Sequence, residues 1–290
     1  MTKLIGFYSV APGEGKRTIS QVAAKLLAQE QKVLYVELDY YRPSFAVTTG
    51  LSHSEKNFYN FINHFKEHGR FDLKSYIANV SEIKASNKRL AATKHFSENL
   101  SFLTLPIEFY GNESSFPSLI DENESSQNYK EFIKNFSQAF VNRFKQSNFD
   151  VVLFILPHYE ESLFTLPIIE QCDEIIHVIT ANPTSMIKYK NFKEKIYNSL
   201  DIDLKNRWRT VINKVTDMVP ESEYYKLFDD EAVAALIPYD AKQSENDFTY
   251  SVGTESIEEK VGLLLTSLGF YVEIPKPKKG FFRGLISNAN

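Results

Sequence analysis

The stretch that decides the fold is YSVAPGEGKRTIS, from Tyr8 to Ser20. An apolar run leads into a turn that contains Gly13 and Gly15, and a helical pattern follows Lys16. This order is typical of a phosphate-binding loop, because glycines let the backbone approach the phosphates, amide groups at a helix N-terminus point at them, and a lysine bridges the outer ones. We therefore predict a phosphate cradle between a strand and a helix.

The loop departs twice from the usual spacing GxxxxGK[ST]. Val10 stands where the first glycine belongs, and Arg17 stands where a Ser or Thr would hold a magnesium ion. Thr18 keeps a hydroxyl, but one position further along a helix it points about 100° away. Three places for the Arg17 guanidinium remain open: on phosphate oxygens in the metal's position, paired with Asp39, or in solvent. An ordinary strand-to-helix turn is the alternative for the whole stretch.

Continuous apolar runs elsewhere predict strands that are buried on both faces, as in a parallel sheet. They are residues 3–10, 32–38, 100–106, 150–157, 174–180, 209–215 and 232–238. Helical patterns lie between several of them, for example at 19–31 and 128–146. Alternating strands and helices predict an α/β fold, a doubly wound and mostly parallel sheet flanked by helices, with ligands beyond the carboxyl ends of the strands.

The chain divides into one large domain and a short C-terminal extension. We expect the domain at residues 1–269, with a mostly helical insertion or cover at 48–99 and a polar surface loop at 110–128. Two prolines, Pro275 and Pro277, indicate a stiff linker over 270–277. Residues 278–290 then form a basic and aromatic tail.

Composition limits the classes of function. The 290 residues are 43% hydrophobic and carry 33 basic against 37 acidic side chains, a net charge of −4, so nothing attracts nucleic acid or anionic lipid globally. The single cysteine, Cys172, excludes an intrachain disulfide, and the histidines show no metal-ligand spacing. No secretory signal or apolar run of about 20 residues is seen, so we expect a cytoplasmic protein without a specific nucleic-acid partner.

The segment from Ala11 to Phe45 resembles the opening of the MinD/ParA superfamily of deviant P-loop ATPases, which belongs to the SIMIBI class. It is most similar to the CpaE/TadZ-like and bacterial tyrosine-kinase (CpsD/CapB-like) branches, because VLYVELDYYRPS matches their second strand. NLSFLTLP, FDVVLFILP, CDEIIHVITANPTSM, TVINKV and LIPYD follow in the family's order. The resemblance covers Lys3 to about Gly269 and implies a P-loop NTPase-like single domain, bound ATP or ADP and a homodimer.

The same resemblance implies the residues of the nucleotide site. Asn213 matches the asparagine that reads adenine, although a helix cap or turn is its structural alternative. Pro238 and Asp240 match the loop along the base. Together with the cradle, the implied nucleotide-binding residues are Gly13, Glu14, Gly15, Lys16, Arg17, Thr18, Asn213, Pro238 and Asp240.

Several departures from the family concern the metal and the dimer. Ile155 replaces the fourth-strand Asp that positions magnesium, with Leu156 next to it, and Ala11 replaces a lysine that reaches the partner's nucleotide. Together with Arg17, these changes remove the usual supports of Mg²⁺, and we assign no metal site. No catalytic set is intact. The remaining candidates are Lys16, Asp39 and Glu37, where the two acids hold a metal or water or else cap a loop.

The tail combines an apolar face with cations. A helix starting near Lys279 would place Phe281, Phe282, Leu285 and Ile286 on one side, and the cations Lys278, Lys279 and Arg283 would flank it. This composition suits an interfacial helix on an anionic membrane, and it resembles the membrane-targeting helix of MinD. One short helix binds weakly, so stable attachment requires a dimer. A disordered or locally packed terminus is the alternative.

Taken together, the sequence predicts a CpaE/TadZ-like localisation or assembly factor at the inner face of the cell membrane. It would bind adenine nucleotide with little or no hydrolysis, and its partner would belong to a pilus, secretion or envelope assembly. One alternative is an active ATPase whose unusual metal site uses Asp39 and Glu37. A second is a nucleotide-free interaction protein or an activator of a partner ATPase or kinase.

Overall fold

A computed structural model describes residues 1–40, 45, 51, 54–86, 96–106, 126–158, 164–199, 206–227, 233–249 and 251–274. Within these residues the chain forms an eight-stranded sheet in the order β3-β4-β2-β5-β1-β6-β7-β8. The strands are β1 (Lys3–Tyr8), β2 (Val33–Glu37), β3 (Ala78–Asn79), β4 (Leu100–Leu103), β5 (Val151–Ile155), β6 (Glu174–Thr180), β7 (Trp208–Val215) and β8 (Val233–Pro238). All seven predicted strands are present, which confirms the predicted fold.

Every strand pair is parallel except one. Strand β3 runs antiparallel to β4, where Ala78 lies opposite Phe102. Sequence analysis placed these residues in a mostly helical insertion, because two residues are too few to show an alternating pattern. The described parts of that insertion otherwise contain helices, and the predicted surface loop at 110–128 lies largely outside the described residues.

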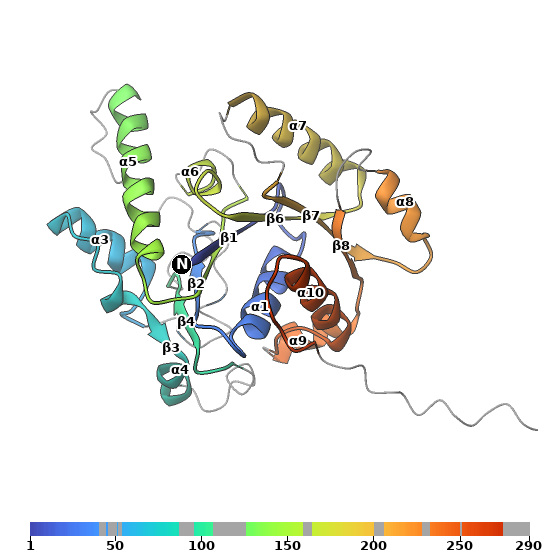
Figure 1. Ribbon diagram of the computed structural model, residues 1–290, viewed down its shortest axis with the longest axis horizontal. Coiled ribbons are helices and arrows are strands. Elements are labelled where there is room, and N and C mark those ends of the chain that lie inside the picture. Colours follow the sequence, from blue (N-terminus) through green and yellow to red (C-terminus); the bar gives the residue numbers. More distant parts are fainter. Residues whose placement is uncertain are drawn as a thin grey trace, which may run out of the picture.

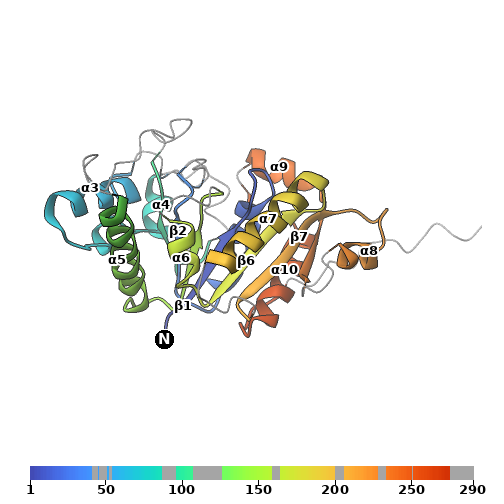
Figure 2. The same ribbon diagram turned by 90° about the horizontal axis from the view of Figure 1, so that it is seen from above.

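Helices cover both faces of the sheet (Figure 1). They are α1 (Lys16–Leu27), α3 (Phe58–His68), the short 3₁₀ helix η1 (Lys74–Tyr76), α4 (Val80–Ser86), α5 (Ser126–Lys145), α6 (Leu166–Ile169), α7 (Pro183–Ser199), α8 (Glu221–Lys226), α9 (Lys242–Thr249) and α10 (Glu255–Ser267). Helices α5, α6 and α7 lie on one face, and α1, α9 and α10 lie on the other. Figure 2 looks down on the face that carries α5, α6 and α7.

Alternating side chains divide the core into two layers. In β5, Val151, Leu153 and Ile155 pack with α1 and α10, while Val152 and Phe154 pack with the layer under α5 and α6. Because side chains point alternately to the two faces of a strand, a strand covered by helices on both faces is apolar throughout. This burial explains why the strands appear as continuous apolar runs in the sequence.

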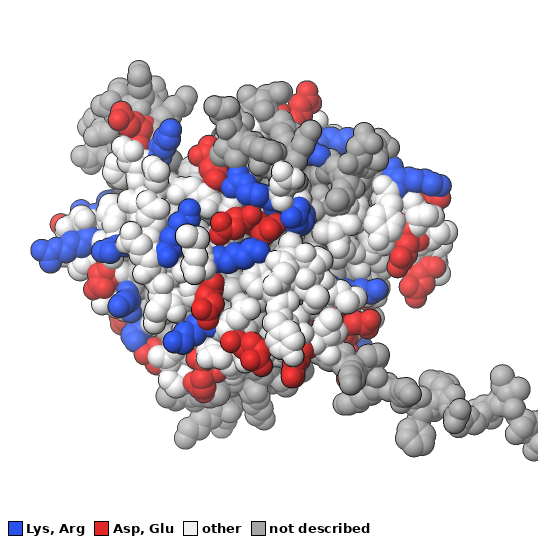
Figure 3. All heavy atoms as spheres, viewed as in Figure 1, with Lys and Arg blue, Asp and Glu red and all other residues white. Residues whose placement is uncertain are grey.

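The packed domain extends beyond α10. Phe270 and Val272 are buried in the layer that contains α1 and α10, and Ile274 packs against it. The predicted linker at 270–277 therefore begins after this segment, and its remaining residues, like the tail 278–290, lie outside the described residues. Among the described helices, none is both long enough and apolar enough to cross a membrane. On the face seen in Figure 3, the described Lys and Arg side chains are mixed with Asp and Glu.

A buried histidine is the main polar side chain in the centre of the sheet. His177 in β6 is fully buried, and neither of its ring nitrogens has a hydrogen-bond partner among the described residues. Its ring stacks on Tyr8 and on Tyr189, with centroid distances of 5.5 and 4.8 Å. Burial, with a smaller contribution from the charge of Lys193, lowers the pKa of His177 to about 3. The imidazole is therefore neutral at physiological pH.

We expect His177 to make the fold sensitive to acid. In the unfolded chain this histidine has an ordinary pKa near 6.5, whereas in the folded protein it stays neutral down to about pH 3. The free energy of unfolding therefore falls as the pH drops from about 6.5 to 3, with a slope of up to about 1.4 kcal/mol per pH unit. His177→Phe should remove that slope from urea-unfolding free energies measured between pH 4 and pH 7. An unchanged slope in the variant would show that His177 is not the responsible group.

Candidate phosphate-binding site

The loop after β1 has the backbone of an anion cradle. Gly13 and Gly15 have φ angles of 84° and 94°, and Gly15 caps the N-terminus of α1. A Cβ atom on Gly15 would lie 2.0 Å from Nδ2 of Asn213, so the close approach of β7 requires glycine here. Left-handed glycines followed by a helix N-terminus direct successive N–H groups to one side.

Two side chains from the end of β7 hold this loop. Asn213 Nδ2 donates to the Glu14 carbonyl at 2.7 Å, and Lys214 Nζ donates to the Gly13 carbonyl at 2.8 Å. In a trans peptide the N–H group points opposite to the carbonyl. The N–H groups of Gly15 and Glu14 are therefore turned away from β7. Lys214 has a φ angle of 60°, rare for a residue with a side chain, which is consistent with a position shaped for this contact.

A cavity of about 360 Å³ lies at the carboxyl ends of the strands, beside this loop. It contains all nine residues that the resemblance implies for nucleotide binding, and also Asp39. The cavity wall further includes Ser9, Pro12, His158, Lys214, Tyr239, Gln243, Ser244 and Ile257, which sequence analysis did not identify.

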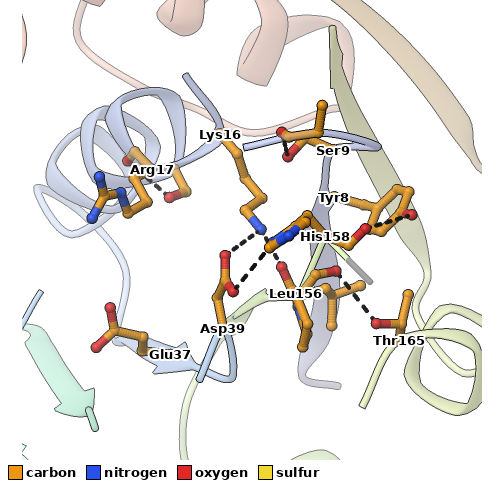
Figure 4. A network of polar contacts seen from close by, with 12 residues as sticks. Tyr8, Ser9, Lys16, Arg17, Glu37, Asp39, Leu156, His158 and Thr165 are labelled. Atoms are coloured by element: carbon orange, nitrogen blue, oxygen red, sulfur yellow. Dashed lines mark hydrogen bonds and ion pairs between the residues drawn. The ribbon is translucent and has the colours of Figure 1, made fainter. Parts of the chain in front are cut away.

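Lys16 and Asp39 form a buried ion pair in the floor of the cavity (Figure 4). Lys16 Nζ lies 2.8 Å from Asp39 Oδ2 and also donates to the Leu156 carbonyl. The two side chains are only 5% and 7% exposed. His158 Nδ1 lies 4.0 Å from the other carboxylate oxygen of Asp39. The lysine that should bridge phosphates is thus held by the protein in the absence of a ligand.

Glu37 does not belong to the cavity. Its carboxylate is buried and accepts hydrogen bonds from the backbone N–H groups of Phe45, at 3.0 Å, and Leu105, at 3.4 Å. Figure 4 shows Glu37 turned away from Lys16 and Asp39. The expectation that Glu37 and Asp39 together hold a metal is therefore corrected: Glu37 has the loop-capping role that was its alternative.

Arg17 is exposed at the rim of the cavity. Asp39 pairs with Lys16, so the predicted ion pair between Arg17 and Asp39 is not formed, and no described residue forms an ion pair with Arg17. Figure 4 shows its guanidinium pointing away from Lys16. Of the three places considered for Arg17, the structure has the solvent-exposed one, and the side chain stays beside the phosphate cradle.

The described residues do not fit a magnesium ion. Ile155 and Leu156 are buried hydrocarbon where the family has an acid, and Asp39 is occupied by Lys16. Among the residues that the structure describes, no cluster of three His, Cys, Asp or Glu side chains could hold a metal. Magnesium at nucleotide sites is held by one or two carboxylates together with the phosphates, and the ion pair of Asp39 with Lys16 opposes that role for Asp39.

Asp240 fixes a negative charge at the far end of the cavity. Burial alone would raise its pKa, but hydrogen bonds from Thr254, Ser256 and the Lys242 backbone together hold the pKa of Asp240 below its usual range. The Ser256 hydroxyl donates to Asp240 Oδ2 at 2.8 Å. This carboxylate is therefore available as an acceptor for N–H or O–H groups of a ligand.

His158 and Lys214 are the most informative residues that the sequence analysis missed. His158 follows β5 and Lys214 is the penultimate residue of β7, so both occupy the carboxyl ends where ligands of such sheets bind. Their position was the available signal. Histidine at 158 and lysine at 214 are not residues of the family motifs that the sequence was compared with. The contacts of both side chains depend on the three-dimensional arrangement of the loops.

We expect the Lys16–Asp39 pair to determine stability as well as binding. Lys16→Met or Asp39→Asn alone leaves a buried charge without its partner and should cost about 3 to 5 kcal/mol, whereas the double variant should cost less than the sum. Urea unfolding without ligand measures this coupling. The exposed pair Lys226–Glu223, with side chains 69% and 51% exposed, is the matched control and should show less than about 1 kcal/mol. Equal coupling in both pairs would contradict the assignment.

No protein-family model matches this chain, and no curated protein sequence matches it. Solved structures do. They include a putative plasmid partition protein of Borrelia burgdorferi bound to AMPPNP, with a TM-score of 0.66, 14% identity and coverage of 92% of this chain and 98% of that one.

Two MinD structures are also similar. The septum site-determining protein MinD of Pyrococcus horikoshii, complexed with Mg-ADP, has a TM-score of 0.62 and 14% identity, covering 92% of this chain and 96% of that one. A MinC:MinD cell division complex of Aquifex aeolicus matches with a TM-score of 0.61 and 13% identity, covering 95% and 99%. The chain therefore has the fold of MinD/ParA-family ATPases over nearly its whole length.

Proposed function

We propose that this protein is a MinD/ParA-like localisation or assembly factor that binds ATP or ADP with little or no hydrolysis. The observation that carries the proposal is the contrast within one cavity. The cavity retains an amide cradle and Lys16, while the positions implied to support magnesium are Arg17, at its rim, and Ile155, which is buried beneath it in β5 and does not line it. Phosphoryl transfer requires that the phosphate charge be neutralised and that the nucleophile be held in position. We assign cationic residues of this cavity to the first requirement and no residue to the second.

The similar structures support the ligand and the mode of action. Those proteins were solved with AMPPNP, with Mg-ADP and in a complex with MinC. By analogy, we propose that a nucleotide regulates a homodimer, or its contact with a protein of a pilus, secretion or envelope assembly, in the manner of CpaE/TadZ proteins. The similar structures resemble this chain in fold only, so the proposed role is argued from the residues of the cavity.

We expect ATP to bind without magnesium. Lys16 and the loop N–H groups supply the contacts, so calorimetric titrations with Mg²⁺ and with EDTA should give affinities within about threefold of each other, and phosphate release should stay at the background rate. Lys16→Met should weaken binding at least about tenfold, since charged hydrogen bonds are lost; Lys226→Met, at an exposed site, is the control. A tenfold gain in affinity on adding Mg²⁺ would overturn the proposal.

We also propose that the tail anchors the protein at the cytoplasmic face of the membrane. Residues 278–290 lie outside the described residues, so this proposal rests on their sequence. Deleting them should abolish cosedimentation with vesicles that contain phosphatidylglycerol, because the aromatic residues and the cations are removed together. Phosphatidylcholine vesicles are the control. Continued binding of the truncated protein to anionic vesicles would refute the anchor.

A further inference from the structure

Glu14 is a buried carboxylate inside the phosphate loop itself. It lies between the two left-handed glycines, Gly13 and Gly15, and is only 3% exposed. Both carboxylate oxygens are enclosed, and neither has a hydrogen-bond partner of normal geometry among the described residues. A negative charge in such a place is unfavourable, because burial removes the solvation of the ionised carboxylate.

The groups that face Glu14 come from three neighbouring elements. They are the Ser185 hydroxyl and Lys188 in α7, the backbone of Thr180 at the end of β6, and Lys16 at the start of α1. Burial raises the pKa of Glu14 to about 7, and these four neighbours act in the opposite direction without cancelling the effect. Lys16 is already paired with Asp39, and Lys188 is exposed. We therefore expect the Glu14 carboxyl group to exchange a proton near neutral pH.

The Glu14 carboxyl group is enclosed on the side of β6 and α7, and it is no more than one glutamate side chain away from the Glu14 N–H group that would hold a phosphate. The N–H groups of Glu14 and Gly15 are turned away from β7 by Asn213 and Lys214, so the residue that helps to grip the anion also carries the buried acid. A phosphate and an ionised carboxylate repel each other strongly where water is excluded. A phosphate and a neutral carboxyl group do not.

We infer that the loop takes up a proton on Glu14 when it binds a polyphosphate, so that affinity falls as the pH rises. This inference rests on the proposed nucleotide function. At low pH the acid is already neutral and imposes no penalty. At high pH a proton must be captured together with the ligand, so affinity decreases by up to about tenfold for each pH unit.

The test compares ATP binding by the full chain and by Glu14→Gln, in EDTA, between pH 6.5 and pH 8.5. Glutamine has the shape of the protonated acid, so the variant should bind ATP at least about tenfold more tightly than the natural protein at pH 8.5 and should lack its extra pH dependence. Because both proteins meet the same ligand, the ionisation of ATP cancels. Glu194→Gln, at an exposed position of α7, is the matched control and should behave as the natural protein does.

A second measurement does not depend on any variant. Titrations of the natural protein at pH 8 in two buffers of different ionisation enthalpy give the number of protons taken up, and we expect about one more than for Glu14→Gln. Equal proton uptake, or equal pH slopes, would overturn the inference.

The same titrations are repeated with inorganic tripolyphosphate, which separates the inference from the proposed function. Tripolyphosphate binding with proton uptake, but no ATP binding, would support the inference and refute the nucleotide function. If neither ligand binds either protein at any pH, both are refuted.

Discussion

The structure of the cradle depends on two hydrogen bonds that cross from β7 to the loop after β1. Asn213 and Lys214 hold the carbonyls of Glu14 and Gly13, and the rigid peptide planes then turn the following N–H groups away from β7. The glycines make this approach possible, since a side chain on Gly15 would collide with Asn213. In the family, the matching asparagine is implied to read adenine. Here its amide nitrogen donates to the Glu14 carbonyl of the loop.

The buried ion pair connects the loop to the second strand. Lys16 is held by Asp39 and the Leu156 carbonyl, so a phosphate that recruits Lys16 must compete with Asp39. An unpaired buried carboxylate is unfavourable. A ligand that draws Lys16 away would therefore leave the Asp39 carboxylate, just after the end of β2, without its ion-pair partner. The His158 ring lies 4.0 Å from the other carboxylate oxygen of Asp39. The cradle and the end of β2 are thus joined through one buried ion pair.

The sequence predicted the fold well, and it predicted the site less completely. Strands buried on both faces show as continuous apolar runs, and the glycine loop places the site at their carboxyl ends. The different roles of Glu37 and Asp39 were not predictable. They are two residues apart, but β2 ends at Glu37, and the backbone bonds that Glu37 accepts come from Phe45 and Leu105. Such contacts depend on tertiary structure. The short strand β3 (Ala78–Asn79), which runs antiparallel to β4, was missed because two residues are too few to show an alternating pattern of apolar and polar side chains.

The charges in the cavity indicate how a polyphosphate could be bound without a metal. A magnesium ion contributes two positive charges, and in this chain Arg17 and Ile155 stand where the resemblance implies its supports. Arg17 and Lys214 supply exposed cations at the cavity, while Lys16 and Asp39 neutralise each other and Asp240 adds a negative charge. Glu14 is then the one carboxyl group at the phosphate loop that no cation pairs with among the described residues. A proton on Glu14, as we infer, would remove the buried negative charge of the loop when a polyphosphate binds without a metal.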